Sequence, residues 1–243
     1  MELELRSALV TGANRGIGLA TVHALLDAGV VRVYAGARDP DKLEPLIKQY
    51  KDRVVPLELD VTKTKDLNAA AKLAKETTIL INNAGVAEMG PLLDKDAPKR
   101  LKKEWDVNVL GMLNLTRKLV PQMLKNGQGC VVNLNSVASI KSFPFSPTYC
   151  ASKAAAFSIT QGLRNELEHQ GIHVVSVFPG PIDTDMVADL DMPTTDPRHV
   201  GDEIVRAIRE ELAFLLPDDW ALDFWHRFER EPGTVLAEVV DGT

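Results

Sequence analysis

The chain has 243 residues, of which 45% are hydrophobic, and this is enough to bury one large core. Its 28 Lys and Arg against 34 Asp and Glu give a net charge of −6, which argues against nucleic acid or an anionic membrane as a partner. Two cysteines exclude a disulfide framework, and scattered histidines argue against a metal site. We see no signal peptide and no uncharged apolar stretch of about 18 residues, so we expect a cytoplasmic protein.

The first unit along the chain is a strand, a glycine-rich turn and a helix. Residues 7–10 are an apolar strand that runs into Thr11-Gly-Ala-Asn-Arg-Gly-Ile-Gly18, and a helical apolar stripe then continues to Gly29. Glycines let the backbone approach a pyrophosphate, and the helix N-terminus offers free N–H groups to it. An ordinary glycine-rich turn is the alternative. The strand and helix around it favour a cofactor site made by this set: Gly12, Asn14, Arg15, Gly16, Ile17 and Gly18.

The second strand, residues 31–35, is followed by an arginine. In a nucleotide-binding unit this strand end meets the adenosine ribose, where a carboxylate binds the 2′-hydroxyl and an arginine accommodates a 2′-phosphate. Arg38 stands there, and Arg15 lies in the first turn. The pair predicts NADP(H) in preference to NAD(H), while Asp39 leaves NAD(H) possible.

The next two strands also end in polar residues. A helix over residues 42–51 precedes the strand 54–58, and a helix over 66–75 precedes the strand 79–81. Asp60, followed by Val61, either contacts the adenine edge or caps a helix. Asn83, Ala84 and Gly85 follow the fourth strand, at the sheet edge where α/β proteins bind ligands.

A long helix is predicted over residues 98–124. Asn108 interrupts its apolar pattern, and it is either a buried asparagine that needs partners or an ordinary residue of the polar face. Pro121 should kink this helix or mark its weak end.

The fifth strand, residues 130–134, leads to Ser136, and a helix over 147–170 places Tyr149 and Lys153 one turn apart on one face. An ammonium beside a phenol favours the phenolate, so we expect a lowered tyrosine pKa and proton exchange with a substrate. The alternative is an exposed pair on a surface helix. Cys150 is expected to be a packing residue.

The remaining chain gives a strand over residues 172–178, a helix over 200–212 and a seventh strand over 213–216. Residues 185–197 have the composition of a lid, and the aromatic tail 217–243 is expected to form an amphipathic helix on the body or on a partner. Strands that alternate with helices predict one α/β domain over residues 1–243. Its doubly wound, seven-stranded parallel sheet would carry helices on both faces.

Together these motifs resemble the short-chain dehydrogenase/reductase family over residues 6–185. The likeness rests on the glycine turn, Asn82-Asn-Ala-Gly85, an active-site asparagine, and a serine with Tyr-x-x-x-Lys. The resemblance implies a Rossmann-type fold with the catalytic set Asn108, Ser136, Tyr149 and Lys153. It also implies that Tyr149 and Lys153 contact the cofactor, and that the nicotinamide carboxamide is held by Pro179, Gly180, Ile182 and Thr184.

The implied activity is reversible, NADPH-dependent reduction of a ketone or aldehyde, with Tyr149 as the general acid/base. Ser136 would bind the carbonyl oxygen, Lys153 the nicotinamide ribose, and Asn108 a water that links Lys153 to solvent. An NAD-dependent alcohol or hydroxysteroid-type dehydrogenase and a non-catalytic NADP(H) sensor are the alternatives. The resemblance implies a homodimer through the helices near 98–124 and 147–170. The tail replaces the Gly-Gly segment of many tetrameric relatives, so a homotetramer stays open.

The substrate is expected to be a medium-sized apolar or aromatic carbonyl compound. This expectation rests on a proposed pocket wall of Ala87, Met89, Phe143, Phe145, Met186 and Leu190. Phe143 and Phe145 could instead anchor their loop in the core.

Overall fold

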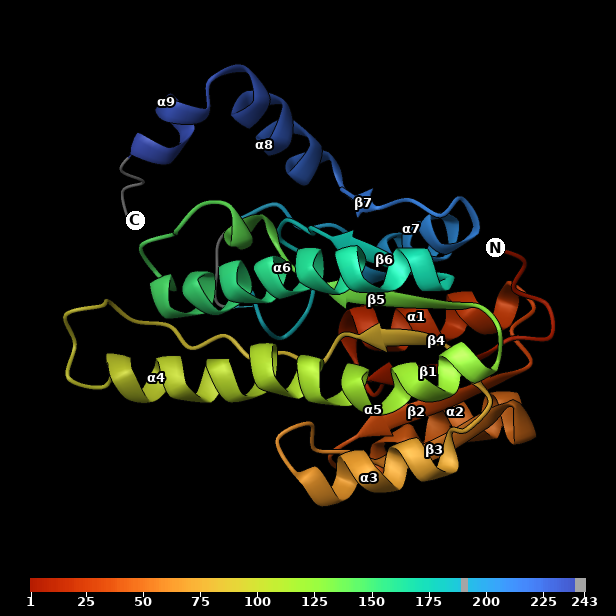
Figure 1. The fold of residues 1–243 in the computed structure, drawn as a ribbon. Coiled ribbons are helices and arrows are strands. Elements are labelled where there is room, and N and C mark those ends of the chain that lie inside the picture. Colours follow the sequence, from red (N-terminus) through yellow and green to blue (C-terminus); the bar gives the residue numbers. More distant parts are fainter. Residues whose placement is uncertain (189–191, 239–243) are drawn as a thin grey trace.

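A seven-stranded parallel sheet forms the centre of the computed structural model, which describes residues 1–188 and 192–238 (Figure 1). The strand order is β3-β2-β1-β4-β5-β6-β7. The strands are β1 (Ser7–Thr11), β2 (Arg32–Ala37), β3 (Val54–Glu58), β4 (Thr77–Asn82), β5 (Gly129–Leu134), β6 (Ile172–Val177) and β7 (Phe214–Leu215). The predicted doubly wound parallel sheet is confirmed.

Helices cover both faces of the sheet. They are α1 (Gly16–Asp27), α2 (Glu44–Tyr50), α3 (Thr64–Leu73), α4 (Ala97–Glu104), α5 (Met112–Lys125), α6 (Pro147–Leu167), α7 (Pro197–Arg209), α8 (Asp219–Arg230) and α9 (Pro232–Ala237). One apolar core packs α1, α2 and α7 against the sheet, and a second packs α3, α5 and α6 against the other face. Because β1, β4 and β5 are covered on both sides, every residue of these strands is buried and their sequences are nearly continuous apolar runs.

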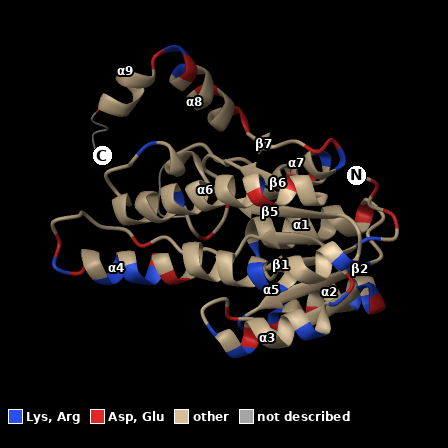
Figure 2. Ribbon diagram, viewed as in Figure 1, with Lys and Arg blue, Asp and Glu red and all other residues tan. Residues whose placement is uncertain are grey.

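Parallel strands with helical crossovers bring all strand carboxyl ends to one edge of the sheet. Charged residues of both signs are spread over the outer helices, including α4, and over the connecting loops (Figure 2). Among the helices of residues 1–188 and 192–238, none combines the length and the apolar character that a membrane crossing requires.

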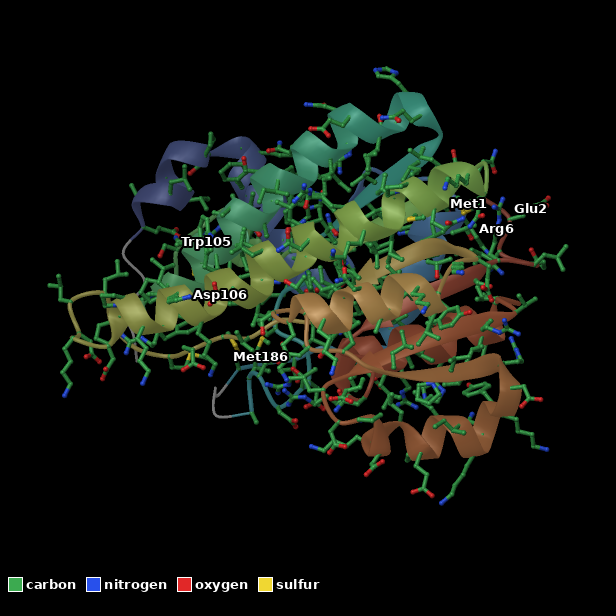
Figure 3. All side chains as sticks on the ribbon, turned by 60° about the horizontal axis from the view of Figure 1, so that its bottom comes forward. Met1, Glu2, Arg6, Trp105, Asp106 and Met186 are labelled. Atoms are coloured by element: carbon green, nitrogen blue, oxygen red, sulfur yellow. The ribbon has the colours of Figure 1, made fainter. Side chains whose placement is uncertain are left out.

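The helix predicted over residues 98–124 is interrupted by a π-helical segment. A π-helical stretch, η3 (Trp105–Gly111), lies between α4 and α5 and contains Asn108. Such wide turns occur frequently at functional sites, because they change the direction in which a side chain leaves the helix. Pro121 lies inside α5, which continues to Lys125, so the proline does not end the helix. Trp105 is 41% exposed, and Figure 3 labels it with Asp106 on this long helix.

The aromatic tail folds back onto the body of the protein. Helices α8 and α9 pack over the β5–α6 connection in a third apolar cluster (Figure 1). Its buried members are Val137, Ala221, Phe224 and Val235. The tail therefore covers the loop that follows Ser136, close to the carboxyl edge of the sheet.

We predict that Gly201→Ala destabilises the protein. A Cβ at Gly201 of α7 would lie 2.8 Å from the Ala20 carbonyl carbon of α1, so the two helices would have to separate. Overpacking of this kind costs about 1–3 kcal/mol, which urea unfolding can measure. Gly233→Ala on α9 is the control, because its Cβ would meet open space. Equal unfolding free energies for the two variants would contradict the prediction.

Candidate active site

A cavity of about 580 Å³ opens at the carboxyl edge of the sheet. The ends of β3, β2 and β1 contribute Asp60, Arg38 and the Gly12 turn to its lining. The ends of β5 and β6 contribute Ser136 and Gly180. Because the sheet order places these strand ends in a row, the cavity is an elongated site in which a long ligand could lie across several strands.

The glycine-rich turn needs its glycines for two reasons. Gly12 and Gly16 have φ values of +64° and +52°, in the left-handed region that favours glycine. Gly18 has no room for a side chain, since a Cβ there would lie 2.2 Å from the Gly12 carbonyl oxygen. Gly18 therefore packs beneath the turn and does not line the cavity, whereas Gly12 and Gly16 do.

The side chains of Thr11 and Asn83 hold this turn in place. The Thr11 Oγ1 accepts hydrogen bonds from the backbone N–H groups of Asn83 and Ala84, both at 2.9 Å. The Asn83 amide donates to the carbonyl oxygens of Thr11 at 2.8 Å and Gly12 at 3.2 Å. Asn83 lines the cavity as expected, but its side-chain amide is used to position the turn.

The N-terminus of α1 has the features of a phosphate site. No side chain of the described residues caps this helix, so its first N–H groups at Gly16, Ile17 and Gly18 are left for another acceptor. The turn and the loop after β6 touch here, because a Cβ at Gly16 would lie 2.9 Å from the Thr184 side chain. A side chain at position 16 would fill this space, whereas the glycine leaves the N–H groups of the turn open to a diphosphate.

The two arginines have different surroundings. Arg38 lines the cavity at the end of β2, and it forms no salt bridge with any acidic residue in the described part of the chain. Arg15 instead forms an ion pair with Asp185, on the loop after β6. Asp60 does not cap α3, for which Lys63 is the N-cap residue; its Oδ1 accepts hydrogen bonds from the N–H and hydroxyl of Thr62 at 3.0 and 2.7 Å.

Tyr149 and Lys153 project from α6 into the cavity beside Ser136. The Lys153 Nζ lies 5.7 Å from the centre of the Tyr149 ring and donates to the Leu134 carbonyl oxygen at 2.5 Å. The Ser136 Oγ accepts from the Ala138 N–H at 3.1 Å, at the start of the short helix η4 (Val137–Ser139). Ser136 is thus held at the strand end by the turn that follows it.

The expected lowering of the Tyr149 pKa is wrong. Burial raises the pKa of the Tyr149 phenol above its ordinary value, and hydrogen bonding with Ser136 opposes this only in part. Burial also lowers the pKa of Lys153 to about 8. The physical reason is that burial penalises the charged form of each group, and for Tyr149 this outweighs the stabilising effect of neighbouring donors. At neutral pH the phenol of Tyr149 is therefore protonated.

Asn108 is buried and does not line the cavity. Its Nδ2 donates to the Val86 carbonyl oxygen and to the Ser152 Oγ, and its Oδ1 accepts from the Val86 N–H, all at 2.9 Å. These bonds hold the loop after β4 against α6, and the wide turn of η3 directs the side chain to them. The predicted water between Asn108 and Lys153 stays a prediction.

The remaining predicted cofactor residues line the same cavity: Asn14, Arg15, Ile17, Val61, Ala84, Gly85, Pro179, Ile182 and Thr184. So does most of the predicted substrate wall: Ala87, Met89, Phe143, Phe145 and Met186, the last labelled in Figure 3. Phe143 also packs in the third apolar cluster, as a loop anchor would, and its contact with a substrate stays a prediction. Leu190 falls outside the residues that the structure describes. The Cys150 Sγ accepts from the Phe143 N–H at 3.3 Å, as a packing residue would.

Sequence reasoning missed two residues of the tail. Trp220 lines the cavity, and Asp218 is buried beside it. The sequence pointed to this region only through the spacing of its aromatic residues. That spacing predicts a helix, but it does not show what the helix packs against. In residues 1–188 and 192–238, no group of three or more His, Cys, Asp and Glu side chains is arranged to hold a metal ion.

Comparisons with known proteins agree with this geometry. Residues 6–194 match the family model described as short chain dehydrogenase. An uncharacterised oxidoreductase from Staphylococcus saprophyticus is 32% identical over 221 residues, which cover 86% of this chain and 94% of that protein. The chain therefore belongs to the short-chain dehydrogenase family and is an oxidoreductase.

Solved structures show the same fold. A short chain dehydrogenase from Burkholderia cenocepacia in complex with NADP is 34% identical, with a TM-score of 0.91 over 98% of this chain and 100% of that one. A family member from Burkholderia phymatum in complex with NAD is 22% identical, with a TM-score of 0.87 over 99% of each chain, and shows a shared fold alone.

Proposed function

We propose that this protein reduces a ketone or aldehyde to the alcohol with NADPH as the cofactor. The Burkholderia cenocepacia relative was crystallised with NADP. In this chain the open N-terminus of α1 fits a diphosphate, and Arg38 stands where a 2′-phosphate would lie. A bound dihydronicotinamide supplies the hydride, and the protein supplies position and charge. NAD(H) remains an acceptable, weaker cofactor.

Tyr149 is proposed to protonate the carbonyl oxygen. As the carbonyl carbon gains a hydride, its oxygen gains an electron pair and takes the phenol proton, which leaves a phenolate. The Ser136 hydroxyl donates a hydrogen bond to the same oxygen and stabilises the developing alkoxide. The Lys153 ammonium, 5.7 Å from the Tyr149 ring, stabilises the phenolate. In the reverse direction each transfer runs backward.

The observation that carries this proposal is that Tyr149, Ser136 and Lys153 line the same elongated cavity as Gly12, Gly16 and Arg38. Burial raises the pKa of Tyr149, so the phenol carries at neutral pH the proton that reduction needs. Oxidation of an alcohol would use the same groups in reverse, and the cofactor ratio and the substrate would then set the direction.

The residues proposed to contact the substrate are apolar or aromatic. Met89, Phe143, Phe145, Met186 and Trp220 all line the cavity. Such a lining suits an apolar or aromatic carbonyl compound of medium size in preference to a sugar or an acid.

We also propose that two chains pair through the long α4–α5 helix and α6, the surface implied by the family resemblance. Trp105 and Leu110 are 41% and 40% exposed on this long helix, and burial in a dimer would remove both from water. The second interface of a tetramer stays open.

We predict that Tyr149→Phe lowers kcat by about 10²- to 10⁴-fold, because the proton donor is lost. A panel of ketones and aldehydes with NADPH, followed by cofactor absorbance, measures this. NADPH binding to the variant should be retained, since the phenyl ring still fills the site. Undiminished turnover by the variant would exclude the proton-transfer role.

The reductive kcat/KM should be constant below pH 8 and should fall at higher pH. The charged form of Lys153 stabilises the phenolate; with a pKa of about 8 it is present below that pH and lost above it. The raised pKa of Tyr149 means that its own ionisation cannot cause this decline. Lys153→Arg is the control, because arginine stays charged and the decline near pH 8 should disappear. A decline that persists in this variant would assign the pH dependence to another group.

Arg38→Ala should narrow the preference for NADPH over NADH. The variant loses the guanidinium that faces the 2′-phosphate, so KM for NADPH rises while KM for NADH changes little. Arg15→Ala is the matched comparison, and we expect a smaller effect because Arg15 is paired with Asp185. An unchanged ratio of the two cofactors in Arg38→Ala would count against the assignment.

A further inference from the structure

The start of the tail touches the loop that follows β6. The buried Asp218 carboxylate accepts hydrogen bonds from the Gly180 N–H and the Ala221 N–H, both at 2.9 Å. A Cβ at Gly180 would lie 2.7 Å from the Asp218 Oδ1 and 3.0 Å from the Trp220 ring. Position 180 therefore has no room for a side chain because α8 begins against it. A single carboxylate, that of Asp218, therefore caps α8 and also binds the loop that follows β6.

Trp220 stands at the point where this contact meets the cavity. Its ring lines the cavity, stacks on Phe224 at a centroid distance of 5.8 Å and lies 6.2 Å from Phe143. Phe143 in turn stacks on Phe145 at 5.8 Å. An aromatic wall thus continues from the β5–α6 connection into the tail, and Trp220 is its tail member.

A second contact holds α9 and Glu238, the residue that follows it. The Lys141 Nζ, which is buried, donates to the Val235 carbonyl oxygen at 2.6 Å and to the Glu238 carboxylate at 3.0 Å. Glu238 also pairs with Arg227 of α8. The start of α8 is thus attached to the loop after β6, and α9 to the β5–α6 connection, so these two loops fix the helix that carries Trp220.

We propose that Trp220 is a specificity-determining residue that selects carbonyl compounds with a planar aromatic group, and that Asp218 is the residue that positions it. The inference deepens the proposed function and rests on it. A flat apolar ring of the substrate would pack against the indole beside Phe143. The carbonyl group would then lie toward Ser136 and Tyr149, which line the same cavity.

The first test compares two aldehydes, benzaldehyde and propanal, in the NADPH-dependent reaction. Trp220→Ala should raise KM for benzaldehyde about tenfold relative to propanal, because the aryl contact is lost. Trp220→Phe should restore most of the discrimination, and the NADPH dissociation constant should stay unchanged in both variants. The matched control is Trp225→Ala on the same helix, since Trp225 contacts Phe178 and Phe228 and does not line the cavity.

A second pair of variants tests whether Asp218 positions Trp220. The two oxygens of Asp218 accept from the Gly180 N–H and the Ala221 N–H separately, and Asp218→Asn replaces one of them with an NH₂ group that cannot accept. One of these two bonds is therefore lost, and we expect the benzaldehyde-to-propanal ratio of KM to shift in the same direction as in Trp220→Ala. Asp219→Asn is the control, because the neighbouring Asp219 is exposed. An unshifted ratio in Asp218→Asn would remove the positioning role.

A measurement without turnover separates this inference from the proposed function. Acetophenone added to the protein should cause a saturable quenching of the indole fluorescence, above the collisional quenching of the exposed Trp105. Trp220→Phe should lose this saturable component, and Trp225→Phe should keep it. Active wild-type enzyme whose aldehyde ratio and quenching do not respond to Trp220 variants would overturn the inference alone. Wild-type protein that reduces no carbonyl compound with either cofactor would overturn the proposed function, and the assignment of substrate selection to Trp220 with it.

Discussion

The geometry of the site depends on the hydrogen bonds between Thr11 and Asn83. They join the end of β1 to the end of β4 below the glycine turn, just beyond Val10 and Ile81, the last residues at which these two strands pair. Each bond satisfies a polar group that has little access to water, so its loss would cost about 1–3 kcal/mol. The turn, the loop after β4 and the N-terminus of α1 keep their relative positions because of this clamp.

A second set of buried polar groups supports the same edge. The Asn82 amide of β4 donates to Asn133 of β5 at 2.8 Å and to Thr116 of α5 at 3.0 Å. Asn133 donates in turn to Thr160 of α6 at 3.0 Å. Satisfied polar networks in a low-dielectric interior are rigid. This one holds α6, which carries Tyr149 and Lys153, in register with the strand that leads to Ser136.

The surroundings of Tyr149 and Lys153 have a chemical consequence. An exposed Tyr and Lys one helical turn apart would attract each other weakly, and the tyrosine would keep an ordinary pKa. In this chain Lys153 is buried and Tyr149 is half-buried, and desolvation favours the neutral forms: the pKa of the phenol rises and that of the ammonium falls to about 8. Tyr149 therefore keeps its proton at neutral pH, which is the form that the proposed carbonyl reduction would use.

Sequence alone determined the features that are local in the chain. Alternating strands and helices specified the parallel sheet, and the spacing of Gly12, Gly16 and Gly18 specified a tight turn before α1. The crossover rule then predicted that the special residues would share one edge, and nearly all of them line one cavity there. These inferences succeed because glycine conformation and side-chain periodicity depend on near neighbours.

Tertiary structure alone decided what depends on distant parts of the chain. The direction of the Tyr149 pKa follows from burial, which no four-residue spacing reports. Arg15 meets Asp185, and Trp220 meets Phe143, across long stretches of sequence. The π-helical turn at Asn108 directs its side chain to Val86 and Ser152, and these partners come from other parts of the chain. Electrostatics and packing act through space, so the sequence named most of the residues of the site, and only the fold determined their surroundings.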